Sequence, residues 1–422
     1  MSKNRSLLLI FTITIFDVVA ANGLGALIAD YVINLPNKPV LMTAGTAVML
    51  AIQLALSPAI GYWADQRGRR PATIATTIMS LLSNLLLLPL QSWGYFANRA
   101  FKGATNGLYS VMRSAMADQT EKDELLRFSG LLSFISGSGT ILGPMIAGVL
   151  MLVYSGGRIS PIPTVILLLA IGVLNIGLAF LFKETSPKEE PIEVKEVVKK
   201  ATNALKVVSL WNQLADADKE LPGIKPVFIL NMLATLSMGY YAFFVAFMTQ
   251  SDLIMTPRET AWFFLGYGSL AVLANLIFFT YIAPRVNKRK IILFLSMAGV
   301  TLQGLYAFSE SSQTMFYIVA GFDAITVSIM TGLTGSILSV MVKQGGSQGE
   351  MFGNIQALGG VASFVTALIN SLLSGVSMKA PFIFCGLSMI AVFIWSMRLP
   401  QDARKYTDVK SMEELEEEPK EA

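Results

Sequence analysis

Four charged side chains lie inside runs of apolar residues that are long enough to cross a membrane. Asp17 lies in the first such run, Arg99 and Lys102 lie in the fourth, and Asp323 lies in the tenth. A charge in the middle of a bilayer costs about 2.5 kcal/mol or more on insertion scales, so each of these groups needs a charged partner or water. We therefore expect these four residues to take part in proton coupling.

Asp17 and Lys102 are expected to meet near the middle of the bilayer. Counted along their own spans at about 1.5 Å of rise per residue, the two residues reach a similar depth. Arg99 lies one helical turn from Lys102 on the same face. A carboxyl group that exchanges water for a neighbouring cation can change its protonation state, so Asp17 is the first candidate for the proton carrier. A static Asp17–Lys102 ion pair is the alternative.

Asp323, in Gly321-Phe322-Asp323-Ala324, has three open roles: a second proton site, a contact for a cationic substrate, or a partner for a polar side chain. Other polar residues in apolar runs can line a substrate cavity or hydrogen-bond between helices; these candidates are Asn22, Asn231, Tyr240, Tyr241 and Gln356. A set of aromatic residues can form a wall for a lipophilic substrate, although a lipid-facing position or interfacial packing is the expected role for most of them. This set is Phe243, Phe244, Trp262, Phe263 and Phe264.

The composition indicates a membrane protein with many spans. Of 422 residues, 53% are hydrophobic and 14% are charged, whereas a soluble domain carries about 25% charged residues. The absence of His and the single Cys exclude zincin motifs, Ser-His-Asp triads and a disulfide framework. No Gly-x-x-x-x-Gly-Lys-Ser/Thr phosphate-binding loop is present. We expect no enzyme activity, no catalytic residues, no metal or cofactor, and no nucleic-acid partner.

The apolar runs predict an all-α membrane protein with twelve transmembrane helices in two six-helix bundles, since a span needs about 20 residues. The expected spans are 6–33, 40–63, 72–90, 93–117, 126–154, 161–182, 225–250, 258–283, 289–308, 312–342, 350–375 and 380–398. The expected domains are an N-terminal bundle (1–183), a cytoplasmic linker with an amphipathic helix (184–223), a C-terminal bundle (224–399) and an acidic, disordered cytoplasmic tail (400–422).

A strongly charged turn joins the second and third expected spans, and Gly68 allows its sharp bend. Its arginines, with the other Lys and Arg residues of alternate loops, place the turn and both termini in the cytoplasm. A topology anchor is one function of this turn, and an ion-pair latch that gates the cytoplasmic side is the other. The residues expected in this gate are Gly61, Asp65, Arg67, Gly68, Arg69, Arg70, Asp118 and Arg127. Exposed pairs would contribute only about 0–1 kcal/mol each.

Small residues in the fifth expected span form the most specific pattern. Gly139, Gly143 and Ala147 lie near one helix face, where backbones can approach closely, and Pro144 permits a kink. We expect this face to be a sliding seam, with ordinary small-residue packing as the alternative. The residues of the seam are Gly130, Gly139, Gly143, Pro144 and Gly148.

Three of these stretches resemble motifs of the major facilitator superfamily. The charged turn is similar to the motif between the second and third helices of that family, although Gln66 stands where the family has Arg or Lys. The fifth-span pattern resembles a motif of drug:proton antiporters, with Ala147 in place of a Gly. Arg99-Ala100-Phe101-Lys102-Gly103 is similar to the fourth-helix motif, with Lys102 in place of a Gln. Phe16-Asp17 resembles the first span of tetracycline-efflux-like members, although the prolines usual there are missing.

This resemblance implies a secondary transporter that exports a small lipophilic or drug-like molecule against proton entry, by alternating access of its two bundles. It implies a monomer in a plasma membrane, specifically a bacterial inner membrane, whose partners are its substrate, protons and the lipid bilayer. Two alternatives share the fold: a proton-coupled importer of a small nutrient, and a non-transporting or lipid-translocating relative.

Overall fold

The computed structural model describes residues 3–408, apart from some short segments. These segments are 33, 121–127, 129–130, 133–134, 136–138, 140–141, 148–149, 151–160, 187–192, 205, 240–242 and 345–347. Gly130, Gly148, Arg127, Tyr240 and Tyr241, to which the sequence assigns roles, lie outside the described residues.

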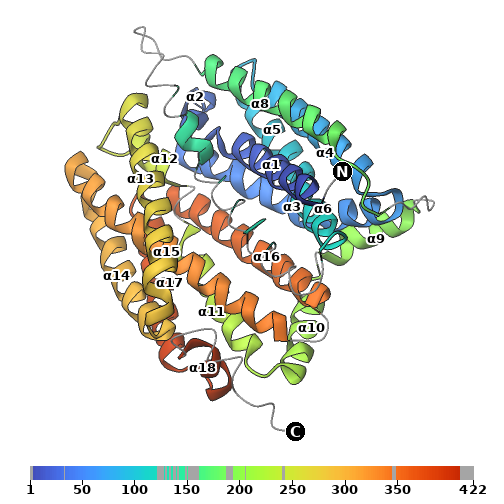
Figure 1. Cartoon of the computed structure of the whole chain (residues 1–422). Helices are drawn as coiled ribbons and strands as arrows, with labels where there is room; N and C mark the ends of the chain where they lie inside the picture. The colour runs from blue at the N-terminus through green and yellow to red at the C-terminus, as the bar shows by residue number, and fades with distance from the viewer. Residues whose placement is uncertain are drawn as a thin grey trace. The chain divides into compact units, whose positions relative to one another are not determined.

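The described part of the chain is helical and contains no strand (Figure 1). Helices suit long apolar segments because every backbone hydrogen bond is then made within the segment, where lipid offers no partner. Among the described residues, seven helices are long and apolar enough to cross a membrane, and shorter apolar helices accompany them. The predicted all-α membrane class is therefore confirmed, and twelve spans are consistent with these elements.

Contacts between Cα atoms divide the chain into two compact units. The first unit comprises Met1–Lys206 and Met255–Leu265, and the second comprises Val207–Ile254 and Gly266–Ala422. The helices that begin in the first unit are α1 (Lys3–Asn22), η1 (Gly25–Leu27), α2 (Ile28–Tyr31), α3 (Lys38–Arg67), α4 (Arg69–Leu85), α5 (Ser92–Thr105), α6 (Leu108–Ala117), α8 (Ile162–Leu181), α9 (Val194–Ala204) and α13 (Pro257–Ile277). Within this unit α1 packs against α8 and α6, α3 packs against α5, and α4 packs against both α5 and α8.

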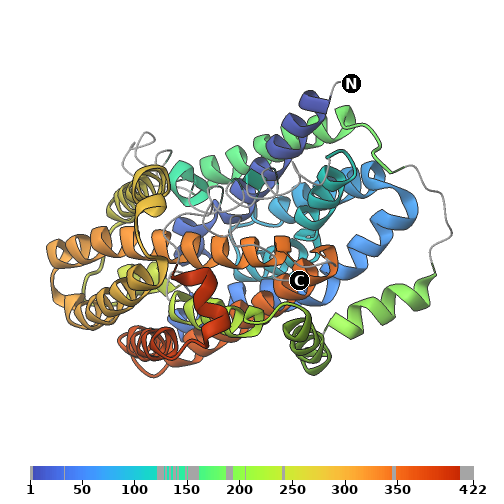
Figure 2. The same ribbon diagram turned by 60° about the horizontal axis from the view of Figure 1, so that its bottom comes forward.

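In the second unit, α14 packs against α17 and α15, and α11 packs against α15, α16 and α17 (Figures 1 and 2). The remaining helices are α10 (Val207–Glu220), α11 (Ile224–Ser237), α12 (Phe244–Gln250), η3 (Phe278–Ile282), η4 (Ala283–Arg285), α14 (Lys288–Phe308), η5 (Ser309–Ser311), α15 (Gln313–Gln344), α16 (Gln348–Ser374), α17 (Ala380–Met397) and α18 (Gln401–Thr407). A continuous apolar core joins these helices, with Phe228 of α11, Met330 of α15 and Met389 of α17 all fully buried.

Several of the expected spans are divided in the part of the chain that the structure describes. The span expected at 93–117 is broken between α5 and α6 at Asn106 and Gly107. A Cβ at Gly107 would lie 2.8 Å from Ile60 Cδ1, so close packing against α3 accompanies the break. The span expected at 225–250 likewise consists of α11 and α12. Hydropathy predicts the length of an apolar run, but it does not detect such interruptions.

The segment expected to carry one amphipathic linker helix carries two, α9 and α10. Helix α9 packs against α3 within the first unit, whereas α10 packs against α16 and α11 within the second. The boundary between the units, after Lys206, therefore falls between these two helices.

The expectation that the whole tail after residue 400 is disordered is wrong for residues 401–407, which form α18. Ala403 and Thr407 are completely buried, and α18 packs against α11, α14 and α15. Asp408, just after the helix, accepts a hydrogen bond at its carbonyl from the Asn287 side chain at 2.9 Å and pairs with Arg289 at 3.4 Å. These contacts outweigh the acidic composition that suggested disorder.

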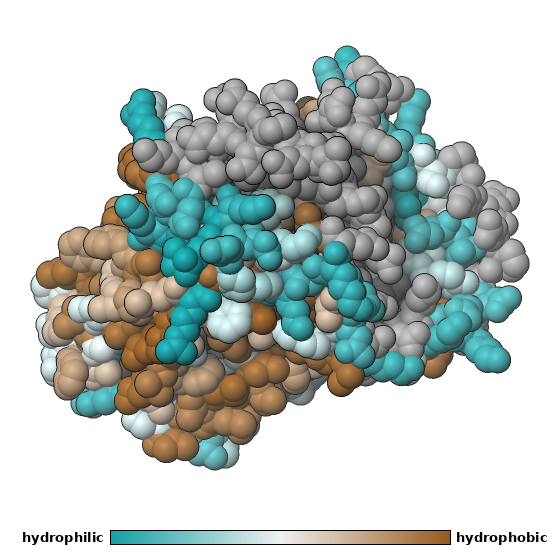
Figure 3. All heavy atoms as spheres, turned by 90° about the horizontal axis from the view of Figure 1, so that it is seen from below, coloured by the Kyte–Doolittle hydropathy of each residue, from teal (hydrophilic) through white to brown (hydrophobic). Residues whose placement is uncertain are grey.

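Many large hydrophobic side chains are exposed on the described helices, including Leu181, Phe294, Phe308 and Leu372, each more than 60% exposed. On the face drawn in Figure 3, hydrophobic side chains gather over a broad area, and hydrophilic ones occupy separate regions. A soluble monomer would not expose so much apolar surface. This surface is consistent with contact with lipid.

The two described glycines of the fifth expected span, Gly139 and Gly143, lie against α1, the helix that carries Asp17. A Cβ at Gly143 would lie 2.8 Å from the carbonyl oxygen of Val19 and 2.9 Å from the nitrogen of Gly23. A Cβ at Gly139 would lie 2.9 Å from Val18 Cβ. The backbones approach so closely that any side chain here would displace α1.

We predict that Gly143→Ala destabilises the protein by about 1–3 kcal/mol, because the added methyl group meets backbone atoms that cannot rotate away. The measurement is the midpoint of thermal unfolding of the full chain in detergent. Gly177→Ala on α8 is the matched control, because its added Cβ would have no heavy atom within 4 Å. Equal midpoints for the two variants would contradict the close approach of the backbones.

Candidate functional site

Asp17 and Lys102 form a buried ion pair in the first unit. Lys102 Nζ donates to Asp17 Oδ1 at 2.7 Å, and the two side chains are 0% and 5% exposed. Ser80 Oγ donates to the same carboxylate oxygen at 2.8 Å and accepts a hydrogen bond from Lys102 Nζ. Three helices, α1, α4 and α5, thus supply one residue each to a compact triad.

Arg99 does not join this triad. Its Nη2 donates to the carbonyl oxygen of Ala21 at 3.3 Å, and its Nε donates to Asn98 Oδ1 at 3.1 Å. The guanidinium carbon also lies 6.0 Å from the centre of the Tyr95 ring, within the range of a cation–π contact. The sequence predicts that Asp17 meets Lys102, with Arg99 one turn away on the same face, and the structure pairs Asp17 with Lys102.

Helical periodicity explains this arrangement. Residues three or four apart share a helix face, so Asp17 and Ala21 of α1 face Lys102 and Arg99 of α5. Close packing between α3 and α5 supports this alignment, since a Cβ at Gly103 would lie 3.0 Å from Ile52 Cβ.

No role was predicted for Ser80 from the sequence, although the residue pattern of α4 indicates a polar face that contains it. Helix α4 places small polar residues at helical spacing along one buried face: Thr73, Thr76, Thr77, Ser80, Ser83 and Asn84. Four of the hydroxyl groups bond to carbonyls of the preceding turn, which is the usual use of such residues in apolar helices. Ser80 differs because its hydroxyl group bonds to the ion pair.

In the second unit, Asp323 of α15 is 1% exposed and accepts two hydrogen bonds at Oδ2. Tyr267 Oη of α13 donates at 3.2 Å and Tyr306 Oη of α14 donates at 3.1 Å. Hydrogen bonds to a charged group contribute about 1.5–3 kcal/mol each. Two of them are comparable with the cost of about 2.5–3.5 kcal/mol for an ionised Asp at the centre of a membrane helix. The two tyrosine hydrogen bonds therefore stabilise an ionised carboxylate at this position.

Aromatic rings surround these tyrosines. The Tyr306 ring stacks on Phe382 with centroids 4.9 Å apart, and Phe244 lies 5.4 Å from Tyr306 and 5.7 Å from Tyr267. Phe243 and Phe244 are fully buried and Phe263 and Phe264 nearly so, whereas Trp262 is 51% exposed. Of the two roles expected for most of these five residues, a lipid-facing position is therefore wrong for all but Trp262.

The other predicted substrate residues are not brought together by the described contacts. The Asn22 side chain donates to the Val18 carbonyl oxygen of its own helix at 2.9 Å. Asn231 is half-buried on α11, and Gln356 lies on α16. Among the described residues, no group of three or more Cys, Asp or Glu side chains could hold a metal ion.

The charged turn is held by contacts inside the first unit. Arg69 of α4 pairs with Asp65 and, at 3.1 Å, with Asp118 at the end of α6. Burial lowers the pKa of Arg69, but the two carboxylates outweigh that effect and leave its pKa above the ordinary value. Arg70 donates to the carbonyl oxygen of Phe180 at 3.0 Å. Gly61 is half-buried in α3, and Arg67 is exposed.

Glu184, which follows the sixth expected span, was not predicted to contribute to the turn. Its Oε1 accepts from the backbone nitrogen of Arg69 at 2.8 Å, and its Oε2 accepts from that of Arg70 at 2.9 Å. The carboxylate thus satisfies two free donors at the start of α4, where the helix dipole also favours a negative charge. Gly68 has φ of 97°, and a Cβ there would collide with Glu184.

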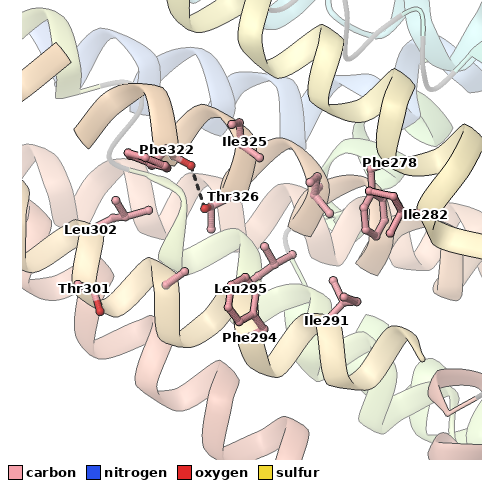
Figure 4. A pocket seen from close by; sticks show the side chains of 12 residues that line it. Phe278, Ile282, Ile291, Phe294, Leu295, Thr301, Leu302, Phe322, Ile325 and Thr326 are labelled. Carbon is pink, nitrogen blue, oxygen red and sulfur yellow. Dashed lines mark hydrogen bonds between the residues drawn. The ribbon is translucent and has the colours of Figure 1, made fainter. Parts of the chain in front are cut away.

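An apolar groove of about 500 Å³ lies on the second unit along η3, α14 and α15 (Figure 4). Its two threonine hydroxyls, of Thr301 and Thr326, donate to carbonyl oxygens of their own helices. Phe322 lines this groove, whereas the next residue, Asp323, bonds to the tyrosines of α13 and α14. Helix α15 therefore presents hydrocarbon on one face and its carboxyl group on another.

We predict that Asp17→Asn and Lys102→Met each lower the thermal stability of the protein more than the double variant does. Removal of one member of a buried pair leaves a charge uncompensated and costs about 3–5 kcal/mol, whereas replacement of both members can be neutral. Unfolding midpoints of the four proteins at one pH give the coupling between the two sites. Additive losses would contradict a direct, buried interaction.

The model of one protein family matches nearly the whole chain. The family is described as "Major Facilitator Superfamily", and the matched residues are 7–219 and 227–421.

Individual relatives share a low sequence identity with this chain. A class H tetracycline resistance protein of Pasteurella multocida is 28% identical over 194 residues, which are 44% of this chain and 46% of the relative. A class D tetracycline resistance protein of Salmonella ordonez is 26% identical over 361 residues, 81% of this chain and 80% of the relative. The crystal structure of the human organic anion transporter MFSD10 (TETRAN) superposes with a TM-score of 0.66 at 15% identity, covering 94% of this chain and all of that one. The last likeness concerns the fold alone.

Proposed function

Because this chain belongs to the Major Facilitator Superfamily and is a membrane transporter rather than an enzyme, we propose that it exports a small lipophilic or drug-like molecule in exchange for protons. The observation that carries the proton part is the buried triad of Asp17, Ser80 and Lys102. The export part is supported by the tetracycline resistance relatives and by the packing of Gly139 and Gly143 on α1.

Protonation of Asp17 is the step that drives the transport cycle. The proton neutralises the carboxylate and leaves Lys102 as a buried cation that has lost its counter-charge. A lone buried charge costs about 3–5 kcal/mol relative to the pair, which is enough to shift a two-state equilibrium by more than a hundredfold. The protein relieves this cost by adopting a conformation in which Lys102 reaches water, and it returns when the proton leaves Asp17.

Ser80 and Arg99 support this step in different ways. Ser80 bonds to both members of the pair, so its hydroxyl group can follow Lys102 or remain on the carboxyl group as the pair opens. Arg99 stays on the Ala21 carbonyl oxygen of α1 and holds a second positive charge one turn away. That charge stabilises the ionised form of Asp17 and so favours release of its proton.

The charged turn contributes a cytoplasmic gate in this proposal. Arg69, with Asp65, Asp118 and the Glu184 cap, makes a rigid corner at the start of α4, and α4 is the helix that carries Ser80. A movement of this corner would therefore be transmitted to the triad. The proposed setting is a bacterial inner membrane, with both termini in the cytoplasm and the protein acting as a monomer.

We predict that full-length protein in liposomes accumulates tetracycline, or a lipophilic dye from a test panel, when the interior is more acidic than the exterior. Outward proton flow then drives inward movement of the probe, whichever way the protein is inserted. Asp17→Asn should reduce this accumulation to the level of protein-free vesicles. Asp216→Asn, at an exposed acid of α10 paired with Lys219, should accumulate the probe as the unaltered protein does.

The opposite gradient separates the alternatives. Accumulation only when the exterior is more acidic would indicate an importer and refute exchange. A failure of every probe under both gradients would favour a non-transporting or lipid-translocating relative. Unchanged accumulation by Asp17→Asn would place the coupling group elsewhere.

A further inference from the structure

We propose that the apolar groove along η3, α14 and α15 binds one acyl chain of an anionic phospholipid, whose headgroup lies on Arg285 and Lys290. The groove and both basic residues belong to the second unit, so this site is complete without the buried ion pair of the first. The proposal adds a lipid ligand to the protein, and it does not depend on which molecule the protein transports.

The walls of the groove consist of hydrocarbon and aromatic rings. Phe294 and Phe322 line it and are 69% and 63% exposed, so the groove is open to the surroundings of the unit (Figure 4). The threonine hydroxyls in the lining donate to carbonyl oxygens of their own helices. A site for a drug-like molecule places a few convergent polar groups among its apolar ones. The walls of this groove suit a plain hydrocarbon chain instead.

The length of the groove matches one leaflet of a bilayer. Along α14 the lining runs from Ile291 to Leu302, about 16 Å at the rise of an α-helix. Figure 4 shows these two residues toward opposite ends of the groove. The hydrocarbon core of a bilayer is about 30 Å thick, so one leaflet occupies about 15 Å. An acyl chain that enters beside Ile291 therefore fills the groove as far as Leu302.

Basic side chains lie at the Ile291 end of the groove. Lys290 directly precedes Ile291, and Arg285 follows Ile282, the last groove residue of η3; both basic residues are exposed. Arg289, between them, is already used by an ion pair within the unit. A lipid phosphate at this end would meet two cations and the positive end of the α14 dipole.

The proposed topology places this end of the second unit in the cytoplasm. Basic pockets between membrane helices on that side bind anionic headgroups, and the cytoplasmic leaflet is rich in anionic lipids. The combination of an apolar groove of leaflet length with cations at its cytoplasmic end therefore fits an amphiphile with an anionic headgroup.

The backbone of one wall is unusual. The segment η3 is a π-helix of five residues, and Phe278 and Ile282 at its two ends both line the groove. A π-helix is rare and occurs frequently at functional sites. A chain bound here would contact η3, α14 and α15 together. Because a ligand that binds only the folded state stabilises it, the lipid should raise the midpoint of thermal unfolding.

Native mass spectrometry of the full chain in detergent, titrated with phosphatidylglycerol or phosphatidylcholine, tests the headgroup. We expect one phosphatidylglycerol molecule to be retained at concentrations at which phosphatidylcholine is not. A basic residue near an anionic lipid favours binding about fivefold, so Arg285→Gln and Lys290→Gln should each weaken this preference by about that factor. Lys195→Gln, at an exposed lysine of α9 in the first unit, is the matched control and should keep the preference.

A second pair of variants tests the groove. Ala298 lines it, so Ala298→Trp places an indole ring where the acyl chain would lie. This variant should lose the retained lipid, and phosphatidylglycerol should no longer raise its unfolding midpoint. Ala170→Trp, at an exposed position of α8 in the first unit, should behave as the unaltered protein does in both measurements.

Three results would overturn the proposal. One is equal retention of the two lipids by the unaltered protein, and another is the same lipid binding by Ala298→Trp and Ala170→Trp. The third is a dimer in the mass spectra that Ala298→Trp abolishes, because the groove would then be covered by a second copy of the chain. The two Gln variants change exposed side chains, so they keep the test decisive should Ala298→Trp fail to fold.

Discussion

The ion pair between Asp17 and Lys102 is the contact on which the proposed account of this transporter depends. A membrane-spanning helix that carries a charge is stable only while that charge is compensated. In the first unit, Asp17, Lys102 and Ser80 satisfy this requirement by direct contact, and each comes from a different helix. Because the pair is buried, the attraction between its charges is little screened by water. Loss of one charge therefore changes the free energy of this conformation by a large amount.

The two units meet the same physical problem with different chemistry. In the first, the carboxylate has a cation and a serine hydroxyl as partners. In the second, the carboxylate of Asp323 has two phenol hydroxyls and a shell of packed rings. A positively charged turn precedes a helix in both units, and an acid pairs with an arginine there: Arg69 with Asp118, and Arg289 with Asp408. The likeness between the units is thus stronger at the helix ends than at the buried acids.

The sequence was sufficient for the all-helical membrane class and for part of the site. Apolar runs predict spans because lipid forces each backbone to bond within itself, and equal depth was enough to suggest that Asp17 meets Lys102. The separate contact of Arg99 with the Ala21 carbonyl oxygen was beyond the sequence, because Arg99 lies one turn from Lys102 on the same face and the rotation of α1 decides which atoms it meets.

Other partners could not be predicted because their contacts join distant parts of the chain. Glu184 caps α4 across more than a hundred residues, and the two tyrosines of Asp323 come from two other helices. The helix α18 was missed because charge content suggests disorder, whereas the burial of Ala403 and Thr407 depends on a surface formed by other helices.

The most direct test of the account is the structure of the full chain in lipid, determined at an alkaline and at an acidic pH. The account predicts that the contact between Lys102 Nζ and Asp17 Oδ1, 2.7 Å here, persists at alkaline pH. At acidic pH it should open beyond the 4 Å limit of an ion pair, with Lys102 reaching water. An unbroken contact at both pH values, in a protein shown to transport under the same conditions, would contradict it.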